Sequence, residues 1–271
     1  MQVVEEAVAR GLPETERFEM RRALVNIPVG LYAVQGTRRA KALLQRMAEN
    51  PSVYSNEISD AIFTASHYLD PKKTADEVQR SHAREMIGLL FEPARHALIN
   101  RRELNSDPET NRKFLDILDS AGSRIVFSFG LASHGVAGDD VLDEDERTKH
   151  YLEVKPLLER LLGNASDETP VPLTPQTAYY LLQLMNGILD IDPVNVLGFA
   201  SAVCAGGSIF GFELDSSARD EAVKLVDHAL ADHKDTLKSS AASVGHMLDL
   251  FVKAGWSEAL ALTFRLDEAF R

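Results

Sequence analysis

Residues 176–189 (QTAYYLLQLMNGIL) and 194–210 (VNVLGFASAVCAGGSIF) are apolar on nearly every side of a helix. A helix of this kind needs neighbours on several sides, because water would otherwise contact its hydrophobic side chains. Asp192-Pro193, between the two segments, combines an N-cap with a proline at the first helical position. We therefore expect a hairpin of two buried helices at the centre of the C-terminal half.

Amphipathic stripes at the helical spacing i, i+3, i+4, i+7 recur outward from this hairpin. Strand-type alternation is almost absent. Only residues 124–130 (RIVFSFG) could form a strand, and a single strand would have no partner, so a buried helix is expected there. The sequence predicts an all-α fold with no significant sheet. The stripes are Ala40, Leu43, Leu44 and Met47; Ile58, Ala61, Ile62 and Ala65; Phe114, Ile117, Leu118 and Ala121; Val154, Leu157, Leu158 and Leu161; and Val244, Met247, Leu248 and Phe251.

The expected helices of the C-terminal half fall into pairs. One pair covers 174–190 and 193–210, and the next covers 215–234 and 240–254. The step from pair to pair is about 40 residues, which is the length of a HEAT or armadillo-type unit. Stacked antiparallel pairs of this length predict a right-handed α-α superhelix.

The best candidate for a domain boundary is the polar, proline-bearing segment 163–173. We expect an N-terminal helical array over residues 1–163 and C-terminal helical hairpins with a buried centre over 174–271. One continuous domain with a joint near 163–173 is the alternative. Pro93 and Pro156 fall inside helical patterns and are expected to kink or split those helices.

Composition places the chain among ordinary globular proteins, with 45% hydrophobic and 26% charged residues. Its single cysteine, Cys204, excludes an internal disulfide framework and fits a reducing compartment. No stretch approaches the roughly 18 uninterrupted apolar residues of a membrane span, and the N-terminus lacks the features of a secretory signal. A cytoplasmic location is expected.

Charge is distributed unevenly along the chain. Residues 1–104 carry 15 basic and 14 acidic side chains, whereas residues 105–271 carry 14 and 27. The acidic half would repel a phosphate backbone, so nucleic-acid binding is not expected. The basic clusters at 21–22, 38–41 and 101–102 are either solvated helix surface or a dock for an acidic partner, including the acidic half of this protein itself.

Asp139-Asp140-Val141-Leu142-Asp143 has the DDxxD spacing. These five residues resemble the motif with which isoprenyl diphosphate synthases and terpene cyclases hold Mg²⁺ and a diphosphate. The resemblance implies an all-α, Mg²⁺-dependent enzyme acting on a phosphorylated or diphosphate substrate through Asp139, Asp140 and Asp143. The second acidic motif of those families has no counterpart here. The competing interpretation is an acidic approach to a helix that begins near residue 146, where carboxylates favour the positive end of the helix dipole.

Other catalytic and ligand-binding patterns are weak. Glu92/His96 and Glu146/His150 have the i, i+4 spacing of a metal clamp, which is equally that of an ordinary surface pair. His228 and His233 are five apart and are expected to point in different directions. Residues 206–211 miss the GxSxG spacing, and glycines at a helix end or at a tight helix–helix contact explain them better. No catalytic, cofactor-binding or metal-binding residue and no cofactor is predicted.

Residues 248–271 (LDLFVKAGWSEALALTFRLDEAFR) resemble the end of very long bacterial proteins that carry a nucleotide-binding domain early and a helical array after it. The resemblance implies that this chain is the C-terminal piece of a larger ATPase-like protein. It transfers no active-site residue, because no position here matches one.

The function expected from these features is that of a non-enzymatic helical-repeat scaffold or regulatory region. Its partner would be another protein or a domain missing from this chain, because stacked helices present extended binding surfaces. The diphosphate enzyme described above is the alternative. Membrane and nucleic-acid partners are not expected, and the sequence does not specify an oligomeric state.

Overall fold

The structure, a computed structural model, describes residues 14–100, 107–130, 142–163, 169–209, 211 and 215–269. These residues form eleven helices and no strand, which confirms the predicted all-α class. The helices are α2 (Glu14–Gln35), α3 (Arg38–Ala48), α4 (Ser55–Leu69), α5 (Glu77–Asn100), α6 (Pro108–Phe127), α7 (Glu144–Leu162), α8 (Pro175–Ile188), α9 (Pro193–Ser208), α10 (Ser216–Asp232), α11 (Lys234–Lys253) and α12 (Ser257–Ala269).

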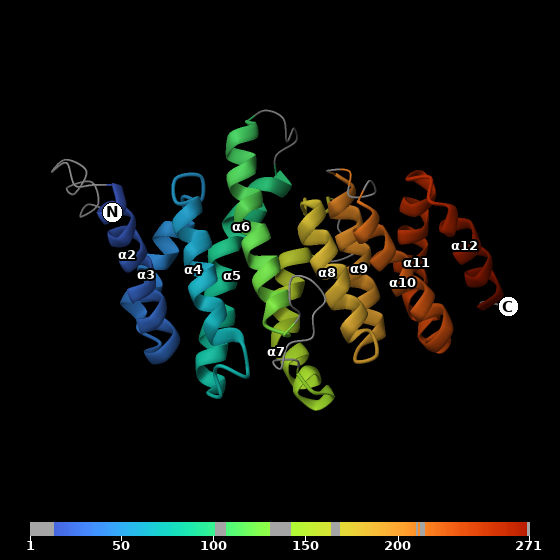
Figure 1. Cartoon of the computed structure of the whole chain (residues 1–271), viewed down its shortest axis with the longest axis horizontal. Helices are drawn as coiled ribbons and strands as arrows, with labels where there is room; N and C mark the ends of the chain where they lie inside the picture. Colours follow the sequence, from blue (N-terminus) through green and yellow to red (C-terminus); the bar gives the residue numbers. More distant parts are fainter. Residues whose placement is uncertain are drawn as a thin grey trace.

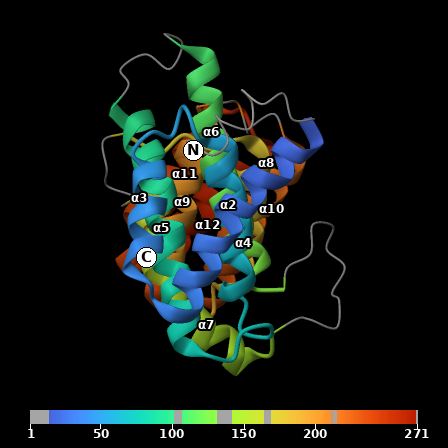
Figure 2. The same ribbon diagram turned by 90° about the vertical axis from the view of Figure 1, so that its left-hand side faces the viewer.

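The helices are arranged in two rows along the long axis of the molecule (Figure 1). Helices α2, α4, α6, α8, α10 and α12 form one row, each in contact with the next, and α3, α5, α7, α9 and α11 form the other. The rows pack against each other, and Figure 2 views the array from its N-terminal end. This stacking agrees with the expected pairing of helices; the right-handed superhelical sense stays a prediction.

The helix start predicted at Asp192-Pro193 is present, and α6 and α8 begin with the same combination of an N-cap and a proline. Side-chain oxygens of Asp107, Thr174 and Asp192 accept hydrogen bonds from the backbone N–H three residues later, at 3.2, 3.4 and 3.4 Å. Helices α8 and α10 begin 41 residues apart, at 175 and 216, and so do α9 and α11, at 193 and 234. The predicted step of about 40 residues from one helix pair to the next is therefore present, although α11 begins at residue 234 and not at 240. Neither Pro93 nor Pro156 splits its helix.

One hydrophobic core follows the array from Val25 to Leu262. It continues past the predicted joint, where Val171 and Leu173 are buried and α6 contacts α8 while α7 contacts α9. The division into two lobes stays a prediction. Four of the five predicted stripes are fully buried, whereas in the first stripe Leu43 is 50% exposed. Among the five stripes, the exposed residue therefore lies on a helix near the end of the array; in the segment 194–210, Val194 and Ile209 at its two ends are exposed as well.

Helix α9 lies at the centre of the C-terminal half, as predicted, with Val196, Leu197 and Val203 fully buried among α7, α8 and α11. Burial raises the pKa of the Cys204 thiol to about 12, so this cysteine is an unreactive core residue. The expected tight glycine contact involves a different neighbour. A Cβ at Gly206 would lie 2.1 Å from the carbonyl oxygen of Val171 in the connecting segment, not against a second helix.

None of the described helices is both long enough and apolar enough to cross a bilayer.

Candidate functional sites

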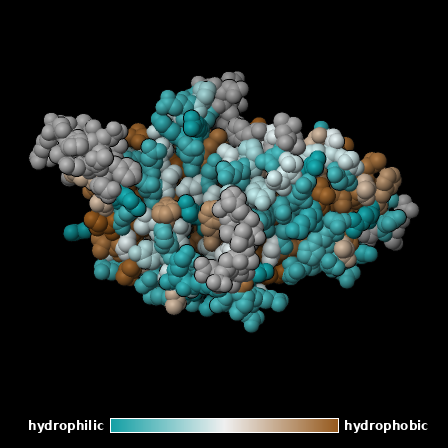
Figure 3. Space-filling view, viewed as in Figure 1, coloured by the Kyte–Doolittle hydropathy of each residue, from teal (hydrophilic) through white to brown (hydrophobic). Residues whose placement is uncertain are grey.

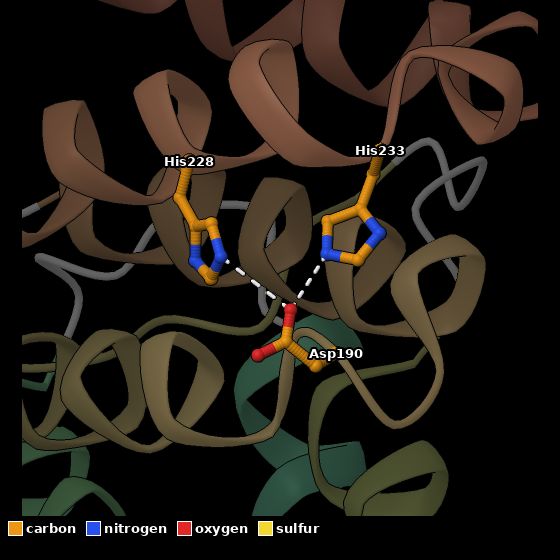
Figure 4. Close-up of side chains that lie close together, drawn as sticks. All are labelled: Asp190, His228 and His233. Atoms are coloured by element: carbon orange, nitrogen blue, oxygen red, sulfur yellow. Dashed lines mark hydrogen bonds and ion pairs between the residues drawn. The ribbon is translucent and has the colours of Figure 1, made fainter.

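Asp190, His228 and His233 form a compact cluster in the C-terminal half of the chain (Figure 4). Asp190 lies in the turn between α8 and α9, His228 is on α10, and His233 joins α10 to α11. The Nε2 atom of His233 lies 2.8 Å from Oδ1 of Asp190, and Nε2 of His228 lies 3.4 Å from the same oxygen. Two imidazole rings therefore converge on one carboxylate oxygen.

The convergence of the two histidines overturns the expectation that they point in different directions. That expectation treated them as members of one helix, but α10 ends at Asp232 and His233 leaves the helical conformation with φ −122° and ψ 36°. The ring centroids are consequently only 5.6 Å apart. Spacing along a single helix could not have predicted this, because the bend at His233 reorients its side chain.

Asp190 was not singled out from the sequence as a partner of these histidines. The repeat offers the reason for their proximity, because Asp190 follows α8 in the way that His233 follows α10, and α8 contacts α10. The turn that follows α8 thus lies beside the corner that follows α10. The 41-residue step could have suggested this contact if the helix ends had been known in advance.

Exposure within the cluster increases from the histidines to the carboxylate. The side chain of His233 is 16% exposed, that of His228 is 31% exposed and that of Asp190 is 73% exposed. His228 also lies 3.5 Å from Oδ2 of Asp232. Among the described residues this is the only group of three or more histidine, cysteine or acidic side chains whose ligand atoms all lie within 4.8 Å of one another.

The DDxxD motif is described only in part, because Asp139 and Asp140 lie outside the described residues. Asp143 is the N-cap of α7 and forms a capping box with Glu146. Its Oδ1 accepts from the Glu146 N–H at 2.8 Å, and the Glu146 carboxylate accepts from the Asp143 N–H at 3.2 Å. Asp143 therefore has the helix-start role that the competing interpretation gave it.

In both pairs with i, i+4 spacing, the carboxylate has a partner other than the histidine. The carboxylate of Glu92 lies 2.7 Å from a guanidinium nitrogen of Arg160, while Glu146 belongs to the capping box. His150 is buried, with Nε2 2.8 Å from the Ser128 hydroxyl oxygen, and burial lowers its pKa to about 4. The hydroxyl of Ser128 donates to the Ile125 carbonyl, so we assign the proton of the neutral His150 ring to Nε2.

A shallow groove of about 340 Å³ lies between α3, α5 and α7. Four of its five charged lining residues form two ion pairs, Lys41 with Glu85 and Arg160 with Glu92, and the fifth is Glu49. Glu85 also accepts from the hydroxyl of Tyr32. The two ion pairs join the helices across the groove, which therefore acts as a junction between α3, α5 and α7.

The two ends of the array expose hydrophobic side chains. On α2, Ile27, Leu31 and Val34 follow the spacing i, i+4, i+7 and are 61%, 41% and 50% exposed, and Leu43 on α3 is exposed at the same end. At the other end, Leu260 and Phe264 lie one turn apart on α12, with Val252 on α11. Figure 3 shows hydrophobic surface at both ends of the long axis. We call these residues the α2–α3 face and the α11–α12 face.

The charges beside the two faces have opposite signs. On the α2–α3 face, exposed Arg39 and Arg46 lie at i−4 and i+3 from Leu43 on the same side of α3. On the α11–α12 face, exposed Asp267 and Glu268 follow Phe264 by three and four residues. The charges beside Leu43 are therefore basic. Those beside Phe264 include the two acidic residues and Arg265, which is paired with Asp227 of α10, and Lys253 follows Val252 on α11.

No family model, curated protein or solved structure matches this chain.

Proposed function

We propose that this chain is a non-enzymatic helical scaffold that acts through protein–protein contacts made by its two ends. The observation that carries the proposal is the exposed apolar face on the first and the last of the described helices. Arrays of stacked helices need a polar outer face on their terminal units to stay soluble as single molecules. Here Ile27 and Phe264 are more than 60% exposed, so a protein surface is expected to cover each of them.

The occupant that fits each end best is the opposite end of a second copy. A contact between the α2–α3 face of one molecule and the α11–α12 face of the next would bury both apolar surfaces and pair Arg39 and Arg46 with acidic residues. A symmetric contact between two like ends would instead place like charges opposite each other, which is unfavourable. The expected assembly is head to tail, and it forms a ring or an open filament according to whether the rotation closes. The sequence also allowed the basic clusters to bind the acidic half of this same protein. The head-to-tail contact would place that interaction between two molecules.

The strength of such a contact is expected to be moderate. Complete burial of a valine, leucine, isoleucine or phenylalanine side chain contributes about 1.5–3 kcal/mol. The loss of rigid-body freedom and the ordering of surface side chains offset a large part of this gain. Assembly should therefore be reversible and should increase with protein concentration. The HEAT or armadillo-like character of the array and the cytoplasmic location, supported by the single buried cysteine, belong to the same proposal.

The test uses one variant of each end, Ile27→Asp and Phe264→Asp, in sedimentation velocity over a concentration series. The wild type is expected to associate, and each variant alone is expected to remain monomeric. An equimolar mixture should form a one-to-one dimer and no larger species, because only one intact pair of ends remains. Leu152→Asp is the matched control: Leu152 is 61% exposed, but it lies on α7 in the middle of the array.

Two results would overturn the proposal. A wild type that stays monomeric at every concentration would show that the ends do not bind each other. A variant that still dimerises by itself would show a symmetric contact. Circular dichroism spectra and melting temperatures that match those of the wild type would establish that a loss of association is not a loss of folding.

A further inference from the structure

We infer that Asp190, His228 and His233 form a binding site for a divalent transition-metal ion, with Zn²⁺ as the ion that best fits their donor atoms. The inference concerns a different surface from the two ends of the array. It does not depend on the proposed assembly.

The donor set selects among metal ions. Two imidazole nitrogens and one carboxylate oxygen are typical ligands of Zn²⁺, whereas Mg²⁺ and Ca²⁺ prefer oxygen donors alone. Both histidines present Nε2 to the shared oxygen (Figure 4). Without an ion, an Nε2–H group donates to the carboxylate, so metal binding requires the proton of each neutral ring to move to Nδ1. A neutral ring with a free Nε2 lone pair is the form that binds a metal.

The two separations between Asp190 and the histidine nitrogens are close to those of a tetrahedral site, and all three ligand atoms lie within 4.8 Å of one another. Zn–N and Zn–O bonds of about 2.0–2.2 Å place neighbouring ligand atoms roughly 3.3–3.5 Å apart. Nε2 of His228 already lies 3.4 Å from Oδ1 of Asp190. The His233 contact, at 2.8 Å, would have to lengthen by about half an ångström. The exposed carboxylate of Asp190 can make this adjustment by rotation, without moving the backbone.

The surroundings favour a cation and offer a further ligand. Asp232, whose Oδ2 lies 3.5 Å from Nε2 of His228, can approach the same ion, or water can complete the site. Asp190 and Asp232 together would balance the charge of a divalent ion. Asp232 is also the last residue of α10, and the C-terminal end of a helix dipole attracts positive charge.

A bound ion would join two neighbouring units of the array. Asp190 belongs to the turn of the α8–α9 hairpin, while His228 and His233 belong to the α10–α11 corner, so ligands 43 residues apart in sequence would share one ion. These three donors converge only in the folded chain. Metal binding should therefore raise the melting temperature in proportion to the logarithm of the free ion concentration above the Kd.

The test measures binding to the full chain after removal of metal with a chelator. Isothermal titration with ZnCl₂ is expected to show one ion per chain, and ZnCl₂ but not MgCl₂ should raise the melting temperature. With CoCl₂, the intense visible d–d bands of tetrahedral Co²⁺ should appear. His228→Gln and Asp190→Asn should each abolish the 1:1 binding and the Co²⁺ bands. His96→Gln, at an exposed histidine of α5, is the control that should retain both.

The inference is wrong if the chain does not bind Zn²⁺ at a 1:1 ratio, or if His228→Gln keeps the Zn²⁺ shift in melting temperature. An equal shift with MgCl₂ would also contradict it, because it would indicate a nonspecific ionic effect. Both ligand variants leave the ends of the array intact. Their sedimentation behaviour can therefore separate failure of the metal site from failure of the assembly.

Discussion

Helices α7 and α9 contact each other in the same row, yet different forces hold them in place. On α7, Glu153 accepts hydrogen bonds from Arg80 at 3.0 Å and from Arg84 at 2.6 Å, both on α5. Between residues 193 and 208, α9 has no charged residue, and its buried positions are mainly aliphatic or small. Removal of a polar partner should therefore destabilise the packing of α7, whereas a larger side chain should destabilise the packing of α9.

The polar contacts of α7 are almost completely satisfied. Arg80, only 4% exposed, also donates to the carbonyl oxygens of Thr74 and Ala75 at 2.8 and 2.9 Å. Burial alone would raise the pKa of Glu153, but the two arginines hold it below its ordinary value. Such a network contributes little net stability relative to an apolar core while it is complete, and it becomes costly when one member is lost.

The largest expected effect is that of Glu153→Ala. It would leave the guanidinium of Arg80 buried without its carboxylate, and loss of one partner of a buried ion pair costs about 3–5 kcal/mol. Urea denaturation monitored by circular dichroism measures the change. Glu159→Ala, at an exposed site of the same helix, should change the free energy of unfolding by less than about 0.5 kcal/mol. Equal effects of the two substitutions would show that the network does not hold α7.

The pH dependence of stability tests a second polar residue of α7. The pKa of His150 falls from its ordinary value of 6.5 to about 4 in the folded protein, mainly because burial disfavours the charged ring, with a further decrease from the nearby charges of Arg80 and Arg84. The unfolded chain binds a proton more readily than the folded chain between these values. The contribution of His150 to the free energy of unfolding is therefore fully present above pH 6.5. It is lost as the pH falls towards 4, by about 3 kcal/mol in total.

The corresponding experiment compares urea midpoints of the wild type and His150→Leu from pH 7 to pH 4. The variant should lose less stability over this range than the wild type, whereas His96→Leu, at an exposed site, should follow the wild type. A His150→Leu profile as steep as that of the wild type would show that other groups cause the acid sensitivity.

Two glycines of α9 test whether close packing holds this helix in place. Gly206→Ala would place a methyl group 2.1 Å from the rigid carbonyl oxygen of Val171, and we expect a loss of about 1–3 kcal/mol. Gly198, on the same helix, has nothing within 4 Å of such a group, so Gly198→Ala should stabilise the protein by up to about 1 kcal/mol. Differential scanning calorimetry of the two variants should show a lower melting temperature for Gly206→Ala and a higher one for Gly198→Ala. Similar effects of the two substitutions would contradict close packing at Gly206.

The smallest effect is expected for Asp143→Ala, at the start of α7. Loss of the capping box should lower the free energy of unfolding by about 1 kcal/mol. The melting temperature should respond to MgCl₂ identically in the wild type and the variant, because the side chain caps a helix. A Mg²⁺-dependent stabilisation that disappears with Asp143→Ala would instead favour the diphosphate-enzyme alternative.

Features set by local sequence were accessible in advance. The spacing of Ile58, Ala61 and Ile62 is enough to predict a buried helix face, and Asp192-Pro193 is enough to predict a helix start, because each depends on neighbouring residues only. The exposed position of Leu43 was not predictable in this way. A helical stripe shows which side of α3 is apolar, but not that α3 lies at an end where nothing in the described part of the chain covers that side.

The cluster around Asp190 was missed for a related physical reason. Its geometry depends on where α10 ends, on the bend at His233 and on the packing of α8 beside α10. Spacing within one helix contains none of these. The contact of Gly206 with Val171 is also long-range, and the sequence showed only that a small residue was required there.

Small-angle X-ray scattering of the wild type over a concentration series tests the proposed assembly most directly. Head-to-tail contact through the α2–α3 and α11–α12 faces predicts that the maximum dimension grows with concentration while the radius of gyration of the cross-section stays constant. Scattering that fits a single molecule at every concentration, or growth that thickens the cross-section, would contradict the account.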